Sequence, residues 1–190
     1  MFHIIQNRLF ETRELIAQML NEKNLLEDTV NAARKIISSL KSGGTIFFCG
    51  NGGSAADAQH LAAELQGRFL VDRKPYSAIA LTTNTSIITA ITNDYDFSEI
   101  FSRQIKGIGK AKDVLFAIST SGNSKNIIQA LKASKEIGMI TIGLTGVSGG
   151  KMGRECDILL NVPSDQTPRI QEAHIIIGHI LCELIEKEIC

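Results

Sequence analysis

Apolar residues in the first forty positions recur every three or four residues, with charged residues between them. This spacing predicts amphipathic helices, because residues three and four apart lie on one face of a helix. The positions that carry the pattern are Leu9, Ile16, Leu20, Leu25, Leu26, Val30, Ala33 and Ile37. Gly43 and Gly44 then favour a helix end. We expect residues 1–42 to form a helical arm that packs either on a partner subunit, serving oligomerisation, or as a cap over the core.

From Thr45 onward, short apolar runs alternate with stretches of helical periodicity. The predicted strands are Thr45–Cys49, Ser77–Leu81, Val114–Ser119, Met139–Leu144 and Ile158–Val162. The predicted helices are Ala55–Leu65, Ser86–Ile91, Phe97–Lys106, Ser124–Ile137 and Pro168–Glu188. Continuous apolar strands that alternate with helices are typical of a parallel sheet covered on both faces. The sequence therefore predicts one α/β domain over residues 1–190, a doubly wound five-stranded parallel sheet with an N-terminal helical extension.

Two predicted strand-to-helix loops are rich in glycine, serine and asparagine. The glycine loop (residues 49–54) reads Cys-Gly-Asn-Gly-Gly-Ser, and the serine loop (residues 119–124) reads Ser-Thr-Ser-Gly-Asn-Ser. Such loops offer backbone N–H groups and hydroxyls to an anion at the start of a helix. Neither matches a dinucleotide fingerprint or a Walker A motif. The alternative for each is a tight turn with a serine N-cap, and Ser54 with Asp57 even fits a capping box. Two such loops in equivalent positions favour a phosphate site.

Histidines and acids on two predicted helices form the second candidate feature. His60 and Glu64 are four residues apart and share a helix face, which suits a metal pair, an acid–base pair or a solvated surface pair. On the last helix, Gln171 and His179 are two turns apart and lie on roughly the same face. We expect His174 to be a surface or interface residue rather than a ligand.

Composition and charge narrow the possible partners and the compartment. Lys plus Arg and Asp plus Glu each total 20, there is no Trp, and aromatic residues make up 5%. This balance argues against nucleic acid and an anionic membrane as partners. No apolar run approaches the ~18 residues of a membrane span, and the first residues of the arm lack the basic region and apolar core that are typical of a signal peptide. The four cysteines form no CxxC pair, so we expect free thiols and a cytoplasmic location. Cys182, one turn after His179, is an alternative metal ligand.

Several segments together resemble the signature of the bacterial phosphoheptose isomerases, the sedoheptulose 7-phosphate isomerases of the sugar isomerase (SIS) domain family. The matching segments are Cys49–Leu65, Asn93–Asp94, Ser119–Ser124, and Arg169–His174 with His179 beyond it. The resemblance covers essentially the whole chain, and its first motif is long and specific. The serine loop alone would indicate only the wider family of phosphosugar-binding proteins. The resemblance implies a single SIS domain over residues 1–190 and a homotetramer whose active sites lie near subunit interfaces.

The resemblance also assigns roles to individual residues. It implies that the substrate is contacted by Asn51, Gly52, Gly53, Glu64, Asn93, Asp94 and Gln171, and that its phosphate is held by Ser119, Thr120, Ser121 and Ser124. Glu64 and His179 match the family's catalytic pair. The zinc site, with one Zn²⁺ per subunit, would comprise His60, Glu64, Gln171 and His179. Arg68 and Arg169 also match, with Arg169 expected in a structural polar network. The chain departs from the family at Pro168, which fits a first helical position after Thr167 as N-cap.

The resemblance implies the isomerisation of sedoheptulose 7-phosphate to D-glycero-D-manno-heptose 7-phosphate, for surface lipopolysaccharide or capsule. The residue types themselves suit the interconversion of a ketose and an aldose. A carboxylate can remove the carbon-bound proton to give an enediol(ate), and a histidine can move the oxygen-bound proton. Zn²⁺ would polarise the carbonyl, although a carboxylate bound tightly to zinc is a poorer base. The alternative function is a non-catalytic SIS-family tetramer that binds the replication initiator protein. Such relatives share both loops, so the intact set of His60, Glu64, Gln171 and His179 favours the enzyme.

Overall fold

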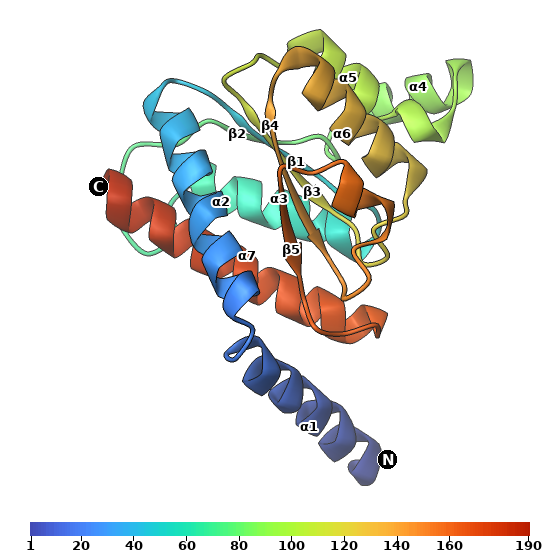
Figure 1. Ribbon diagram of the computed structural model, residues 1–190. Coiled ribbons are helices and arrows are strands. Elements are labelled where there is room, and N and C mark those ends of the chain that lie inside the picture. The colour runs from blue at the N-terminus through green and yellow to red at the C-terminus, as the bar shows by residue number, and fades with distance from the viewer.

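A computed structural model describes all residues, 1–190, and its centre is a parallel sheet (Figure 1). The strands are β1 (Ile46–Cys49), β2 (Ala78–Ala80), β3 (Val114–Ile118), β4 (Ile140–Thr145) and β5 (Ile158–Asn161). Their order is β2-β1-β3-β4-β5, and every neighbouring pair is parallel. The chain moves outward from β1 to β2 and then returns to the other side at β3. The strand order therefore reverses between β1 and β3, where ligands bind in folds of this type. The predicted doubly wound sheet is confirmed.

Helices cover both faces of the sheet. They are α1 (Phe2–Met19), α2 (Lys23–Lys41), α3 (Gly53–Gln66), α4 (Thr85–Asp94), α5 (Ser102–Ile108), α6 (Lys125–Ile137) and α7 (Thr167–Ile189), with short 3-10 helices η1 (Phe97–Glu99) and η2 (Gly150–Arg154). Side chains of a strand alternate between the two faces. Ile46 and Phe48 of β1 accordingly join the core under α2, α3 and α7, whereas Phe47 and Cys49 join the core under α5 and α6. Burial on both sides explains why the strands read as continuous apolar runs.

The two N-terminal helices behave differently. Helix α2 packs on α7 and the sheet through buried residues such as Ala32, Ala33 and Ile36. Helix α1 extends away from the body of the molecule, with only Leu15 and Met19 buried (Figure 1). Its outer turns leave large apolar side chains exposed, namely Phe2, Ile4, Ile5, Leu9 and Phe10. The cap expected over the core therefore describes α2, whereas α1 presents an uncovered apolar surface.

Several predicted boundaries were wrong in detail. The predicted helix Phe97–Lys106 is instead η1 followed by α5, because the Asp96 carboxylate accepts the N–H of Ser98 and starts a separate turn. The predicted capping box at Ser54 is also wrong. Helix α3 begins earlier, after Gly52 as N-cap at φ +54, and Ser54 is buried within its first turn. The last helix begins at Thr167, one residue before the predicted start at Pro168, and its N-cap is Gln166.

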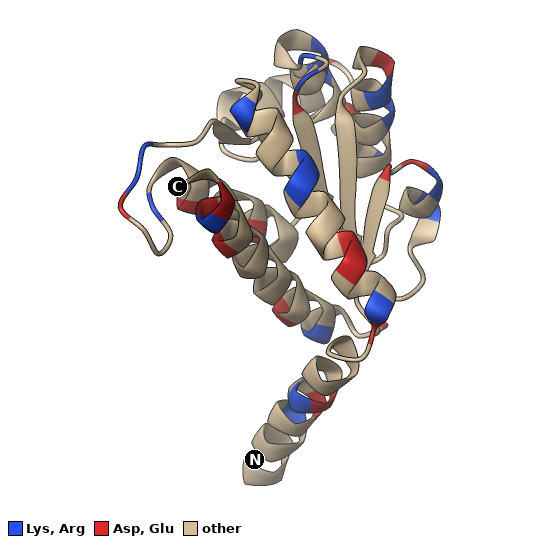
Figure 2. Ribbon diagram, turned by 60° about the vertical axis from the view of Figure 1, so that its left-hand side comes forward, with Lys and Arg blue, Asp and Glu red and all other residues tan.

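The charged residues are distributed without a patch of one sign along the outer helices. Figure 2 shows basic and acidic residues interspersed along α2 and α7, as the equal totals of the two classes suggest. None of the helices is both long and apolar enough to cross a membrane.

Candidate active site

The glycine loop and the serine loop leave neighbouring strands at the same edge of the sheet. Cys49, the last residue of β1, pairs with Ala117 of β3. The loops that follow therefore lie on either side of the point where strand order reverses, and each leads into a helix. The sequence-predicted phosphate residues thus occupy the place where this fold class binds ligands.

The serine loop presents hydroxyls that are not used to cap its helix. Ser124 is the N-cap of α6 but makes no side-chain bond to the helix backbone. Its Oγ lies 3.2 Å from Oγ of Ser119, and the hydroxyl of Ser121 accepts only the N–H of Asn123 two residues on. The serine N-cap of the alternative interpretation is therefore present at Ser124, but without the side-chain bond by which a serine caps a helix. The arrangement leaves hydroxyl protons available for an anion at the start of a helix.

Close packing from behind fixes the shape of the serine loop. Gly122 has φ +63, and a β-carbon there would lie 2.3 Å from the carbonyl oxygen of Gly149. The backbone N–H of Met152 donates to Gly122 O, and that of Lys151 donates to Asn123 Oδ1. The η2 turn therefore supports the loop, and only glycine fits at position 122.

A pair of amide side chains joins the two loops. Asn51 Nδ2 donates to Asn126 Oδ1 at 2.9 Å, and Asn126 Nδ2 donates back to Asn51 Oδ1 at 2.8 Å. Asn126 is only 2% exposed and lies in the first turn of α6. Sequence reasoning missed Asn126, although an asparagine so close to the serine loop was a usable signal. The predicted substrate residue Asn51 therefore also has a structural role, which sets the spacing between the loops.

The glycine loop leaves room for a ligand. Gly52 is exposed, and a β-carbon at this position would meet no atom within 4 Å. A β-carbon on the neighbouring Gly53 would instead come within 2.5 Å of Gln171 Nε2. Gln171 of α7 thus lies against the start of α3, beside the glycine loop. This position suits a substrate contact, and its role as a fourth zinc ligand stays a prediction.

Three of the predicted site residues converge between α3 and α7. His60 Nε2 lies 2.9 Å from His179 Nε2 and 3.2 Å from Glu64 Oε1. One ligand atom from each of the three residues lies within 4.8 Å of the others. Two imidazole nitrogens and one carboxylate oxygen are a common donor set for Zn²⁺. We call these three residues the acid–histidine cluster, and their chemistry fits a divalent metal.

The last helix also carries residues that do not belong to this cluster. Cys182 is buried in the core, where burial raises the pKa of its thiol to about 12, and it is not among the residues whose ligand atoms converge with those of His60. All four cysteines are free, as expected. The expectation that His174 is a surface or interface residue is wrong. This histidine is completely buried, and neither ring nitrogen has a hydrogen-bond partner. Burial lowers the pKa of His174 to about 4, with the Thr145 backbone opposing part of the shift.

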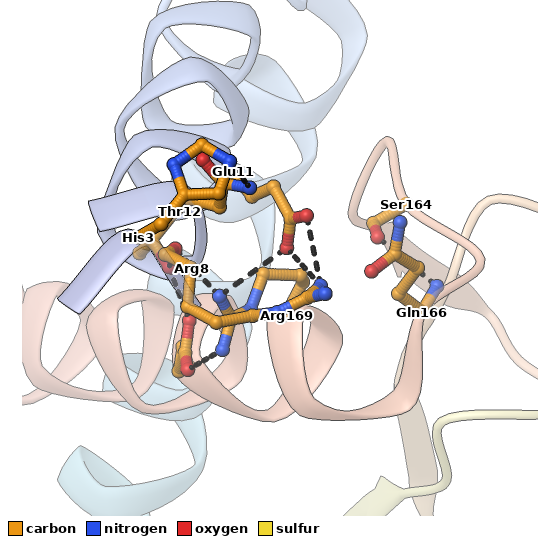
Figure 3. Close-up of polar contacts among 9 residues, drawn as sticks. His3, Arg8, Glu11, Thr12, Ser164, Gln166 and Arg169 are labelled. Carbon is orange, nitrogen blue, oxygen red and sulfur yellow. Dashed lines mark hydrogen bonds and ion pairs between the residues drawn. The ribbon is translucent and has the colours of Figure 1, made fainter. Parts of the chain in front are cut away.

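Arg169 lies in a polar network that connects the start of α7 to α1 (Figure 3). It donates to the carbonyl oxygen of Arg8 and to Glu172 Oε1, and forms an ion pair with Glu11. The predicted network role of Arg169 is thus confirmed. Arg68 is exposed in the segment after α3.

The structure does not bring Asn93 and Asp94 to the two loops through a hydrogen bond. Asn93 Nδ2 donates to Asp94 Oδ1 at 2.8 Å, and both residues are exposed at the end of α4. Helix α4 has no buried residue of its own. The substrate contacts expected of this pair stay a prediction.

Comparisons with known proteins identify the family of this chain. The family model described as SIS domain matches residues 11–146. A phosphoheptose isomerase from Rhodospirillum rubrum is 57% identical over 159 residues, covering 84% of this chain and 85% of the relative. One from Clostridium acetobutylicum is 48% identical over 189 residues, covering 100% of this chain and 96% of the relative.

Solved structures give the same result. The phosphoheptose isomerase of Neisseria gonorrhoeae superposes with a TM-score of 0.91 at 46% identity, covering 97% of this chain and 98% of that one. That of Francisella tularensis gives 0.94 at 38% identity, with 98% of each chain covered. This chain therefore belongs to the SIS domain family and, within it, to the phosphoheptose isomerases.

Proposed function

We propose that this protein converts sedoheptulose 7-phosphate to D-glycero-D-manno-heptose 7-phosphate, and so supplies heptose for surface lipopolysaccharide or capsule. The observation that carries the proposal is the convergence of His60, Glu64 and His179 beside the helix that the glycine loop opens. The relatives reported above are phosphoheptose isomerases, which favours this enzyme over the replication-initiator-binding scaffold.

The substrate phosphate is held by the serine loop. Hydroxyls of Ser119, Ser121 and Ser124, together with Thr120, donate to its oxygens, and the start of α6 adds a favourable dipole. Because this anchoring needs no lysine or arginine, it suits a chain of zero net charge. The sugar then extends past Gly52, Gly53 and Gln171 toward the acid–histidine cluster.

The reaction transfers two protons within the substrate. The Glu64 carboxylate removes a proton from C1 of the ketose, which gives a 1,2-enediol(ate), and returns a proton to C2. His179 moves the oxygen-bound proton from O1 to O2, so that the aldose forms with no net gain or loss of atoms. Histidine suits this transfer because its ordinary pKa lies near neutral pH.

We also propose one Zn²⁺ per subunit, bound by His60, Glu64 and His179 with Gln171 as the fourth ligand. When bound, Zn²⁺ supplies a Lewis acid that polarises the carbonyl and offsets negative charge on the enediolate oxygen. Two histidines and one carboxylate give a pH-dependent affinity, because the ligands must be deprotonated. Full activity and no detectable zinc after exhaustive chelation would remove the metal from the proposal and leave the isomerase intact.

The assembly proposed is a homotetramer with active sites near subunit interfaces, in a reducing cytoplasm that keeps the four thiols free. A groove between α1, α2 and α7 supports the assembly, because nearly all of its lining is apolar, as at Ile16, Val30 and Ile180. Exposed α4 is a second uncovered element, and a neighbouring subunit would bring Asn93 and Asp94 to a site. Light scattering of the purified protein would test the subunit number.

The decisive experiment is incubation of the purified protein with sedoheptulose 7-phosphate, with and without added Zn²⁺. We expect an aldose 7-phosphate product, identified by nuclear magnetic resonance, and loss of that product in the His179→Ala variant. A wild-type protein that binds the sugar phosphate but never forms the aldose would favour the non-catalytic alternative.

A further inference from the structure

A buried ion pair joins the segment after α3 to the last helix. Arg73 Nε lies 2.9 Å from Glu186 Oε1, and the two side chains are 4% and 1% exposed. The contact is an ion pair rather than an aligned hydrogen bond, since Nε has no hydrogen-bond partner. Two charges removed from water carry a large desolvation cost unless other bonds satisfy them. What else these groups contact is therefore informative.

Arg73 holds the end of the helix that carries His60 and Glu64. Its Nη2 donates to the carbonyl oxygen of Glu64 at 2.9 Å, and its Nη1 donates to those of Leu65 at 2.9 Å and Gly67 at 3.3 Å. The last carbonyls of a helix have no partner within the helix, so this guanidinium caps α3. Its plane also lies over the Tyr76 ring, 4.0 Å from the centroid. Arg73 is thereby fixed on several sides.

Glu186 holds the backbone that follows α3. Its Oε1 accepts the N–H of Phe69 at 3.0 Å, and its Oε2 accepts those of Leu70 and Val71 at 2.8 and 3.1 Å. Burial alone would raise the pKa of this carboxyl, but the three N–H donors and Arg73 hold it below its usual value, so Glu186 stays ionised at neutral pH. Every partner of this carboxylate belongs to the segment at 69–73.

Arg73 bonds directly to the backbone of Glu64 in the acid–histidine cluster, whereas Glu186 is linked to the cluster through Phe69 and α7. Glu186 follows His179 by seven residues, or about two turns, on the same side of α7. Phe69, whose N–H bonds to Glu186, stacks its ring on the His179 imidazole, with centroids 5.4 Å apart and planes 23° apart. The pair therefore links the end of α3 to α7 and also places the ring that covers His179.

We propose that Arg73 and Glu186 are positioning residues that fix α3 on α7 and so hold His60 and Glu64 opposite His179, with Phe69 orienting the His179 ring. The inference rests on the proposed function, because it concerns the same cluster. A catalytic or metal-binding arrangement tolerates displacements of only about half an ångström. A well-packed ion pair that joins the two supporting elements meets this requirement.

The test compares Glu186→Gln and Arg73→Lys with Asp113→Asn. Asp113 is an equally buried carboxylate, 2% exposed, that accepts the N–H groups of Thr45 and Lys110 before strands β1 and β3. It lies at the amino ends of the strands, whereas both loops follow their carboxyl ends. The control therefore loses a comparable buried carboxylate without contact to the cluster. Folding is checked by circular dichroism and thermal melting before any binding is measured.

The readouts are the Zn²⁺ dissociation constant, from competition with a chromophoric chelator, and kcat and KM for the sugar phosphate at saturating zinc. We expect Glu186→Gln and Arg73→Lys to weaken zinc binding and lower kcat by about 10- to 100-fold, as loss of a supporting residue does at metal sites. KM should hardly change, because the serine loop is untouched. Asp113→Asn should lower only the melting temperature.

Wild-type zinc affinity and kcat in folded Glu186→Gln would overturn the proposal and leave the isomerase standing. An inactive wild type whose zinc affinity still depends on Glu186 would instead overturn the proposed function and support the positioning role. If both ion-pair variants fail to fold, Phe69→Ala and Phe69→Tyr replace them. Loss of zinc affinity in the alanine variant, with rescue by tyrosine, supports the proposal, and equal affinity in both overturns it.

Discussion

The serine loop and the acid–histidine cluster are built in different ways, although both belong to one site. The serine loop takes its polar groups from six consecutive residues and is shaped by Gly122 and the turn behind it. The cluster joins His60 to His179, which are 119 positions apart, and depends on how α3 packs on α7. The loop therefore forms its binding groups from residues adjacent in sequence, whereas the cluster forms its reactive groups from residues that only tertiary packing brings together. Substitutions in the loop should change KM, and substitutions in the cluster should change kcat.

The largest effect is expected at Glu64, in the cluster. Glu64→Gln keeps the size of the side chain and removes the base, so kcat should fall by ~10²–10⁴ while KM changes little, the usual scale for a lost proton-transfer group. The measurement is the exchange of the C1 hydrogen of the substrate with D₂O, made on a zinc-replete variant.

Metal content separates the two roles given to Glu64. If the carboxylate acts only as a ligand, activity should follow zinc occupancy and return when the variant is saturated with Zn²⁺. Exchange at the wild-type rate in the saturated variant would move the base to another residue, with His179 the next candidate.

The second prediction addresses the serine loop. Removing the hydroxyls of Ser121 and Ser124 together should raise KM by about 10²- to 10⁴-fold, since each charge-assisted hydrogen bond is worth roughly 1.5–3 kcal/mol. Because the cluster is intact, kcat at saturating substrate should stay close to the wild-type value. Steady-state kinetics of the double alanine variant decide this, and unchanged kinetics would exclude the loop as the phosphate site.

The same contrast explains how far sequence reasoning reached. The sheet, the loops and nearly every helix follow from periodicity and local turn chemistry, so they were predicted with small boundary errors. The capping box at Ser54 was wrong because Gly52, at φ +54, begins the helix earlier. Arg73, Glu186 and Asn126 were missed because their roles come from partners distant in sequence. No local pattern shows that a charge in a polar segment will be buried.

The burial of His174 could have been predicted from the spacing of apolar residues in the last helix. Together with the buried residues Ile170, Ile177, Leu181 and Ile185, this histidine forms a series with steps of three or four residues, which marks the core face of α7. The position of a histidine within such a series predicts burial, even though its side chain is polar. His179 lies off this series and remains partly exposed, as a site residue must.

The buried position of His174 gives the third prediction, on pH-dependent stability. The unfolded chain binds a proton at His174 near the ordinary pKa of 6.5, whereas the folded protein does not until about pH 4. Because the unfolded state binds more protons in this window, the free energy of unfolding should fall as the pH drops from about 6.5 to about 4, by roughly 3 kcal/mol in total. Urea unfolding curves across this range measure it.

His174→Leu is the matched variant, because an apolar side chain of similar size leaves no unpartnered nitrogen in the core. The difference between wild type and variant isolates this one group from the carboxylates that titrate at lower pH. Parallel stability curves for the two proteins between pH 4 and 6.5 would contradict the prediction.

The smallest expected effect comes from the contact that lets α3 and α7 approach each other. A β-carbon on Gly178 would lie 2.6 Å from Leu61 Cδ2, and Leu61 is 2% exposed. Overpacking of a core typically destabilises a protein by about 1–3 kcal/mol, whereas replacing a helical glycine by alanine stabilises it by ~0.5–1 kcal/mol. The net effect of Gly178→Ala should therefore be a loss of about 1 kcal/mol in the free energy of unfolding. Gly107→Ala is the control, because a β-carbon there meets no atom within 4 Å, and it should be neutral or stabilising. If packing sets the cluster, Gly178→Ala should also lower zinc affinity and kcat while KM stays constant. An equal change in KM would mean that substrate binding and chemistry do not depend on separate parts of the site. In that case a shift of α3 would also shift the glycine loop from which this helix begins.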